Sequence, residues 1–167
     1  MAVPNVTARA GSTRGDSRPR RVFVIDDTPE FLVLITDLLQ ESGHNVLTSE
    51  GDDIDIATLD GAAPDLIVLD LRLRAVTEQL NGMEFLQLIR AHRHLRRTPV
   101  IVCSADLSQL RENHEALAQD PRCWILPKPF SLDQFEETLD AAIGAPSTPD
   151  VTPRPSSEFS APTAARP

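Results

Sequence analysis

Cysteine is scarce in this chain of 167 residues, which contains only Cys103 and Cys123. Neither belongs to a Cys-X-X-Cys pair or to a histidine-rich ligand spacing, and this argues against a disulfide framework or a cysteine metal centre. Each lies in or beside an apolar run, so we predict two small, buried hydrophobic side chains. A chain of this kind suits a reducing compartment.

Long hydrophobic runs are also missing. No stretch approaches the roughly 20 apolar residues that a membrane-spanning helix needs. The first residues are rich in arginine, serine and glycine and do not form the apolar core of a signal peptide. We therefore expect a cytoplasmic protein that has no membrane partner.

Positive charge is sparse beyond the first residues. The net charge is -9, yet residues 1–21 hold five arginines against one aspartate, which leaves 11 lysines and arginines against 24 aspartates and glutamates. So acidic a body does not suit direct binding to DNA phosphates as the main activity. It suits a site that collects a divalent cation.

Apolar residues are rare at both ends of the chain. Residues 1–20 are mostly Arg, Ser, Gly, Pro and Thr, and residues 144–167 are mostly Pro, Ser, Thr and Ala. Such segments have little to bury, so we predict a disordered basic N-terminal tail and a disordered C-terminal tail. The predicted folded unit is 21–143, and neither tail is large enough for an output domain.

Five short apolar runs lie between the predicted tails. The run at 64–73, Pro-Asp-Leu-Ile-Val-Leu-Asp-Leu-Arg-Leu, is almost unbroken and indicates a strand buried on both faces of a parallel sheet. The other predicted strands are 21–27, 45–49, 99–105 and 123–126. Helical patterns alternate with them near 28–43, 53–59, 82–94 and 107–117, and a last helix follows a predicted Ser131–Gln134 capping box and Phe130–Phe135 staple. This alternation predicts an α/β fold with a doubly wound parallel sheet.

The informative polar residues come at the ends of these runs: Asp26, Asp27, Asp70, Ser104 and Lys128. The carboxyl ends of parallel strands form the ligand crevice of such sheets. Three carboxylates in one pocket repel one another unless a hard cation lies among them, and ligation by oxygen alone indicates Mg²⁺ or Mn²⁺. A lysine and a hydroxyl beside that cation suit a transferred phosphoryl group.

Residues 21–143 resemble the receiver domain of bacterial two-component response regulators. The matching motifs are V-F-V-I-D-D-T at 22–28, D-L-I-V-L-D-L-R-L at 65–73, N-G-M-E-F-L at 81–86, P-V-I-V-C-S-A at 99–105 and L-P-K-P-F at 126–130. The resemblance implies a flavodoxin-like sheet with strand order 2-1-3-4-5 and helices on both faces. It also implies a phosphoacceptor that assists its own phosphoryl transfer and dephosphorylation and is not otherwise an enzyme.

The resemblance further implies a role for each site residue. Asp70 would accept the phosphoryl group from the phosphohistidine of a histidine kinase or phosphotransfer protein. Asp27, Asp70 and the backbone carbonyl of Arg72 would bind Mg²⁺ directly, and Asp26 would act through water. Ser104 and Ala105 would contact the acyl phosphate, Lys128 would pair with it, and the Lys128–Pro129 peptide would be cis. A separate protein would receive the signal.

Two features depart from the family pattern. Residues 74–80 form an insertion that could gate the pocket or be a plain surface loop, since loops tolerate added length at little cost. Ile125 stands where many relatives carry a Tyr or Phe that reports phosphorylation. We therefore expect a different readout, in which the helix at 107–117 repacks against the strand at 123–126 and Trp124 senses the change. Trp124 could equally be a simple anchor in the core or at its rim.

Two alternatives remain open at this point. A phosphatase of the haloacid dehalogenase type also begins with a strand that runs into aspartates, but its two aspartates are separated by one residue, whereas Asp26 and Asp27 are adjacent. A pseudo-receiver that binds a partner without phosphorylation is the other alternative. His92 and His94 are expected on an exposed helix face beside arginines, and we assign them no role.

Overall fold

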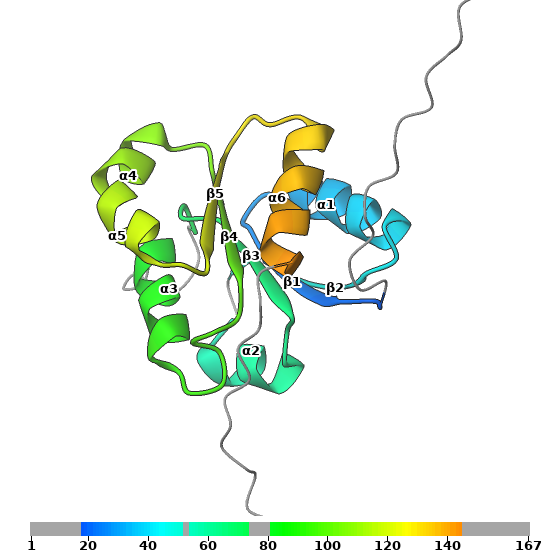
Figure 1. The fold of residues 1–167 in the computed structure, drawn as a ribbon, viewed down its shortest axis with the longest axis horizontal. Helices are drawn as coiled ribbons and strands as arrows, with labels where there is room; N and C mark the ends of the chain where they lie inside the picture. Colours follow the sequence, from blue (N-terminus) through cyan, green and yellow to red (C-terminus); the bar gives the residue numbers. More distant parts are fainter. Residues whose placement is uncertain (1–17, 52–53, 74–80, 145–167) are drawn as a thin grey trace, which may run out of the picture.

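The strands of this protein form one parallel sheet. The computed structural model describes residues 18–51, 54–73 and 81–144, so the predicted insertion at 74–80 and nearly all of both predicted tails lie outside the described residues. The strand order is β2-β1-β3-β4-β5 (Figure 1), which confirms the predicted order. The strands are β1 Arg21–Ile25, β2 Asn45–Ser49, β3 Leu66–Leu69, β4 Val100–Ser104 and β5 Cys123–Pro127.

Alternating strand residues divide the core into two layers. Val22 and Val24 of β1 pack with α1 (Pro29–Glu41) and α6 (Leu132–Gly144) on one face of the sheet. Phe23 and Ile25 pack on the other face, where the core receives side chains from the remaining helices. These are α2 (Ile56–Ala62), α3 (Gly82–Ala91), α4 (Leu107–Glu112) and α5 (His114–Gln119). Helices cover both faces, as predicted (Figure 1).

The strand β3 is the buried centre of the sheet. All four of its side chains are buried, because β1 and β4 pair with it on either side and helices cover both faces. An unbroken Leu-Ile-Val-Leu run suits such a position, since no side chain of the strand faces water. The strand stops at the residue before Asp70, which places that carboxylate at the carboxyl edge of the sheet.

Three predicted helix boundaries are wrong. The helix expected over 107–117 is two short helices, because Asn113 ends α4 and its side-chain amide donates to the Gln109 carbonyl oxygen, competing with regular helical bonding. The helix expected to reach His94 ends at Ala91, since His92 adopts an extended conformation. The helix expected near 53–59 begins at Ile56 and runs past Gly61 to Ala62, where the left-handed Ala63 ends it.

Capping residues fix the start of several helices. The predicted capping box of α6 is present, with the Ser131 backbone N–H donating to Gln134 Oε1 at 2.8 Å and the Gln134 N–H donating to Ser131 Oγ at 3.2 Å. The Phe130 and Phe135 rings stack with centroids 5.8 Å apart, in agreement with the predicted staple. None of the helices among the described residues is both long and apolar enough to cross a membrane.

Candidate functional site

An acid cluster occupies the carboxyl edge of the sheet. Because β1 and β3 pair with Ile25 opposite Leu69, the next residues, Asp26 and Asp70, come side by side. The Asp70 backbone N–H donates to the Ile25 carbonyl oxygen at 2.9 Å and secures this register. One oxygen atom from each of Asp26, Asp27 and Asp70 can be chosen so that all three lie within 4.8 Å of one another. Asp26 is 1% exposed and Asp70 is 5% exposed, whereas Asp27 is half-buried.

Two turns orient the buried carboxylates in the same way. Asp26 Oδ1 accepts a 2.9 Å hydrogen bond from the backbone N–H of Thr28, and Asp70 Oδ1 accepts one of 2.9 Å from that of Arg72. Each is an aspartate bonded to the backbone two residues onward, a common local turn. Thr28 stands at the N-cap of α1, but its side chain makes no capping bond. The turns leave the Oδ2 atoms of Asp26 and Asp70 to meet Lys128.

Lys128 joins the two buried aspartates. Its Nζ atom donates to Asp26 Oδ2 and lies 3.2 Å from Asp70 Oδ2. The same ammonium lies 3.8 Å from the centroid of the Phe31 ring, a cation–π contact. Lys128 directly follows β5, its backbone N–H donates to the Ser104 carbonyl oxygen at 2.9 Å, and its peptide bond to Pro129 is cis, as predicted. Sequence reasoning missed Phe31, because a helical apolar pattern does not show which polar group a ring will meet.

At Asp26 and Lys128, burial and the neighbouring charges shift the pKa values in opposite directions. Burial raises the pKa of Asp26 above its usual value, although the hydrogen bond from Lys128 acts in the other direction. Burial disfavours the charged form of Lys128, but the hydrogen bond from Asp26 and the charges of Asp70 and Asp26 outweigh it and raise the pKa of the ammonium. Asp27 adds a third carboxylate to the two that contact Lys128, and this oxygen-only donor set fits a hard divalent cation.

Ser104 lies at the same edge of the sheet, on the last residue of β4. It is fully buried, and its Oγ accepts a 3.2 Å hydrogen bond from the Asp106 backbone N–H. Asp106 in turn caps α4, because its carboxylate accepts from the backbone N–H groups of Ser108 and Gln109. Ser104 is therefore connected to the start of α4 through its hydrogen bond with Asp106. The neighbouring Ala105 is exposed.

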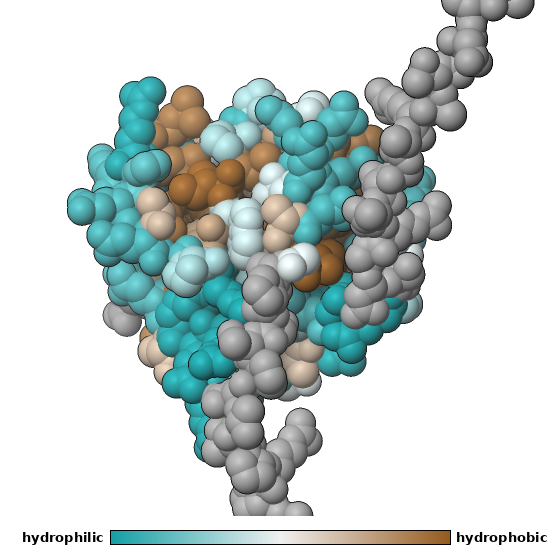
Figure 2. All heavy atoms as spheres, in the orientation of Figure 1, coloured by the Kyte–Doolittle hydropathy of each residue, from teal (hydrophilic) through white to brown (hydrophobic). Residues whose placement is uncertain are grey.

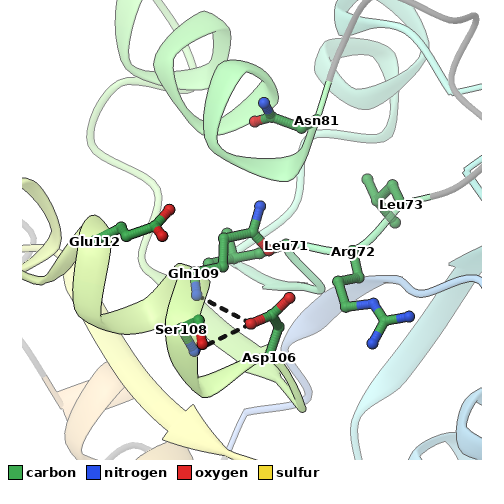
Figure 3. Close-up of a pocket in the computed structure, with 8 residues that line it drawn as sticks. All are labelled: Leu71, Arg72, Leu73, Asn81, Asp106, Ser108, Gln109 and Glu112. Carbon is green, nitrogen blue, oxygen red and sulfur yellow. Dashed lines mark hydrogen bonds between the residues drawn. The ribbon is translucent and has the colours of Figure 1, made fainter.

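A hollow of about 410 Å³ opens beside the acid cluster (Figure 3). The residues that follow Asp70 line one side of it, and α4 with its cap lines the other. Gln109 Oε1 is buried there and has no hydrogen-bond partner among the described residues. The hollow is lined by Leu71, Arg72, Leu73, Asn81, Asp106, Ser108, Gln109 and Glu112.

Gly82, the first residue of α3, lies against the backbone of Asp70 and Leu71. A Cβ atom on this residue would lie 2.5 Å from both the Asp70 carbonyl oxygen and the Leu71 Cα atom, so only glycine lets α3 start this close to the chain after β3. Asn81 forms a capping box with Glu84 and fixes the same helix start. The Asn81–Gly82 pair belongs to the N-G-M-E-F-L motif, and its steric role was not predicted from the sequence.

The two candidate reporter residues on β5 lie on opposite faces of the sheet. Ile125 packs with the core layer that includes Leu110 of α4 and Leu117 of α5. Trp124 packs with the layer of α1 and α6. Trp124 is therefore separated from α4 by the sheet, and it would sense a change in α4 only through β5 itself.

Comparison with known proteins gives a consistent assignment. The chain matches the response regulator receiver domain over residues 22–140. The polar-differentiation response regulator DivK of Brucella anthropi is 26% identical over 128 residues, which cover 75% of this chain and 98% of DivK. The protein RcaC of Microchaete diplosiphon is 33% identical over 86 residues, which cover 52% of this chain and 13% of RcaC.

Solved structures show the same fold. The chemotaxis protein CheY4 of Vibrio cholerae superposes with a TM-score of 0.63 at 22% identity, covering 75% of this chain and 99% of CheY4. The receiver domain of the sensor histidine kinase PA1611 from Pseudomonas aeruginosa, solved with a magnesium ion in its active site cleft, gives a TM-score of 0.60 at 26% identity, with coverage of 77% and 100%. The chain belongs to the response regulator receiver domain family.

Proposed function

We propose that Asp70 accepts a phosphoryl group from the phosphohistidine of a histidine kinase or phosphotransfer protein, in a reaction that needs Mg²⁺. The observation that carries this proposal is the convergence of Asp26, Asp27, Asp70 and Lys128 at one edge of the sheet. Membership of the receiver family supports a phosphoacceptor role in two-component signalling.

The surroundings favour Asp70 as the nucleophile. Both aspartates accept one hydrogen bond from a backbone N–H and one from Lys128, but Asp26 is more deeply buried and makes the closer contact with Lys128. Asp70 makes a longer contact with Lys128, and the residues after it line the open hollow beside α4. A donor phosphoryl group entering from that side would meet the Asp70 carboxylate.

The transfer itself needs few groups. A carboxylate oxygen of Asp70 attacks the phosphorus atom, the phosphorus–nitrogen bond breaks, and the donor histidine leaves with the bonding electron pair. Lys128 then pairs with the new phosphoryl oxygens, and the Ser104 hydroxyl turns to donate to one of them. Asp27, Asp70 and the Arg72 carbonyl would hold Mg²⁺ directly, and Asp26 would hold it through water. When bound, the ion would supply charge neutralisation for the phosphoryl oxygens.

We further propose that the signal reaches a separate effector protein through α4. Ser104 is bonded to Asp106, which caps α4, so a turn of the Ser104 hydroxyl towards a phosphoryl group breaks that connection. Leu110 of α4 and Ile125 of β5 belong to the same core layer, on one face of the sheet. A repacking of this layer changes the surface that an effector meets.

Phosphorylation can be tested with a small acyl or amido phosphate donor. The native chain with Mg²⁺ should gain the mass of one phosphoryl group, and both a chelator and Asp70→Asn should prevent the gain. Asp37→Asn is the matched control, because it makes the same chemical change at an exposed residue of α1. Labelling that persists in Asp70→Asn would contradict the assignment of the phosphoacceptor.

The purified chain also allows the two alternative functions to be tested. Repeated hydrolysis of a phosphomonoester would indicate a phosphatase of the haloacid dehalogenase type. A chain that takes up no phosphoryl group from small donors or from a histidine kinase, yet still binds an effector, would be a phosphorylation-independent interaction module. Either result would overturn the proposed function.

A further inference from the structure

A second cluster of ligand-type side chains lies far from the acid cluster. It consists of Asp60, on the last turn of α2, and His92 and His94, which follow the end of α3. Both helices end where the chain returns to the start of the next strand, so this cluster is at the amino edge of the sheet. In Figure 1, α2 lies beside the lower end of α3.

The three side chains of this cluster lie close to one another. His94 Nδ1 lies 3.1 Å from Asp60 Oδ1, and His92 Nδ1 lies 3.8 Å from the same oxygen. One ligand atom from each residue can be chosen so that all three lie within 4.8 Å of one another. Tetrahedral zinc with bonds of about 2.0–2.2 Å separates its ligands by roughly 3.3–3.6 Å, so small side-chain rotations would complete the set.

The backbone holds these residues in place. The His92 N–H donates to the Leu88 carbonyl oxygen, and the His92 carbonyl oxygen accepts from the N–H groups of Leu95 and Arg96. Leu95 is 2% exposed and anchors the turn that carries both histidines. On the other side, Leu59 is fully buried and fixes the helix turn that carries Asp60.

Within this cluster, the His92 side chain has one ring nitrogen whose hydrogen-bonding capacity is not satisfied. His92 Nδ1 is buried and has no hydrogen-bond partner among the described residues. A buried polar nitrogen without a partner is unfavourable, and an imidazole nitrogen with a free lone pair is a metal ligand. His94 is 65% exposed at its side chain, so the cluster keeps one side open to water.

We propose that Asp60, His92 and His94 form a binding site for Zn²⁺ or a similar divalent transition metal. The two Nδ1 atoms and one carboxylate oxygen supply three ligands, and water takes the fourth position, as in an open zinc site. Imidazole ligands favour such metals over Mg²⁺, which prefers oxygen. The site links α2 to the end of α3 and is independent of phosphorylation at Asp70.

The test uses the full untagged chain and Zn²⁺ alone. Calorimetric titration starts from a reference chain that carries Asp27→Ala, which weakens the acid cluster as a competing site. This reference is compared with chains that carry Asp60→Asn, His92→Gln or His94→Gln in addition. Each change in the second cluster should weaken Zn²⁺ binding at least about tenfold, since even partners of metal ligands contribute 10–100-fold. His114→Gln, an exposed histidine on α5, is the matched control and should bind as before.

Two further measurements make the result decisive. Zn²⁺ should shift the ring nitrogen resonances of His92 and His94 in the native chain and leave those of His114 unchanged. Zn²⁺ should also raise the Tm of the native chain and of His114→Gln, because a ligand of the folded state stabilises it. Equal Zn²⁺ affinity in the reference chain and its three cluster variants, or ring shifts confined to other histidines, would overturn the proposal, whatever the outcome at Asp70.

Discussion

At the scale of single residues, we expect Asp27 and Lys128 to have opposite effects on Mg²⁺ binding. Asp27 contributes a half-buried carboxylate to the three-acid group, whereas Lys128 places a positive charge against Asp26 and Asp70. Removing a carboxylate takes away a ligand for a hard cation, and removing a nearby ammonium takes away a repulsive charge.

We expect Asp27→Ala to abolish measurable Mg²⁺ binding and Lys128→Ala to leave it intact or make it tighter. Calorimetric titration of Mg²⁺ into both variants and the native chain gives the comparison. Lys128→Ala should still lose stability of the phosphorylated form, because the ammonium would no longer pair with the phosphoryl oxygens. Loss of Mg²⁺ affinity in Lys128→Ala as severe as in Asp27→Ala would show that this division of roles is wrong.

The raised pKa of Asp26 predicts a pH dependence for the same site. A carboxyl group with a raised pKa takes up a proton at a higher pH than an ordinary aspartate, and the protonated group no longer attracts a cation. The increase in Tm that Mg²⁺ produces at neutral pH should therefore fade, as the pH is lowered, above the usual range for aspartate. In Asp26→Asn this carboxyl is absent, so the fading should move to lower pH. An unchanged pH profile in Asp26→Asn would mean that another group controls it.

At the scale of helices and strands, the contact between α3 and the end of β3 depends on one glycine. Gly82→Ala should lower the free energy of unfolding by at least about 1–3 kcal/mol, because the new Cβ would overlap the backbone of Asp70 and Leu71. Gly61→Ala is the matched control, since nothing lies within 4 Å of its Cβ position in α2, and it should stabilise by about 0.4–1 kcal/mol. Urea denaturation measures both values, and equal effects would rule out the steric explanation.

The opposite faces of Ile125 and Trp124 make a prediction about β5. Addition of donor and Mg²⁺ should change the emission of Trp124 in the native chain and leave it constant in Asp70→Asn. Because Trp124 packs with α1 and α6, such a change would mean that β5 itself moves when α4 repacks. A constant signal in both chains, with phosphorylation established by mass, would mean that the readout bypasses this strand.

At the scale of the whole molecule, the two cysteines report on global unfolding. Burial raises the pKa of the Cys103 thiol to about 12 and that of the Cys123 thiol to about 12. Since the thiolate is the reactive form, both side chains should be almost inert to a thiol reagent in the native chain at neutral pH and should react fully in denaturant. Fast labelling of Cys103 without denaturant would contradict the buried layer in which it lies.

The apolar runs predicted the strands, the helices and the α/β class of the fold, because these follow from local periodicity. The strand order was implied by the resemblance to receiver domains and not by periodicity. The buried run at 66–69 indicated a central strand, and the acids directly after two of the runs indicated one edge of a parallel sheet. These features are properties of short segments, so Asp26, Asp27, Asp70, Ser104 and Lys128 were recognisable as a group from the chain itself. The capping box of α6 was recognisable for the same reason.

Contacts between distant segments were decided only by the tertiary structure. Lys128 pairs with Asp26 across 102 positions, and His94 meets Asp60 across 34, so no local pattern reveals either pair. The layer that each β5 side chain joins was likewise set when β5 paired with β4 and the helices closed over both faces. His92 illustrates the physical reason. Two polar residues, Arg93 and His94, follow it in the sequence, yet the turn anchored by Leu95 buries its Nδ1 atom against α2. Packing between helices, and not hydropathy, fixes these surroundings.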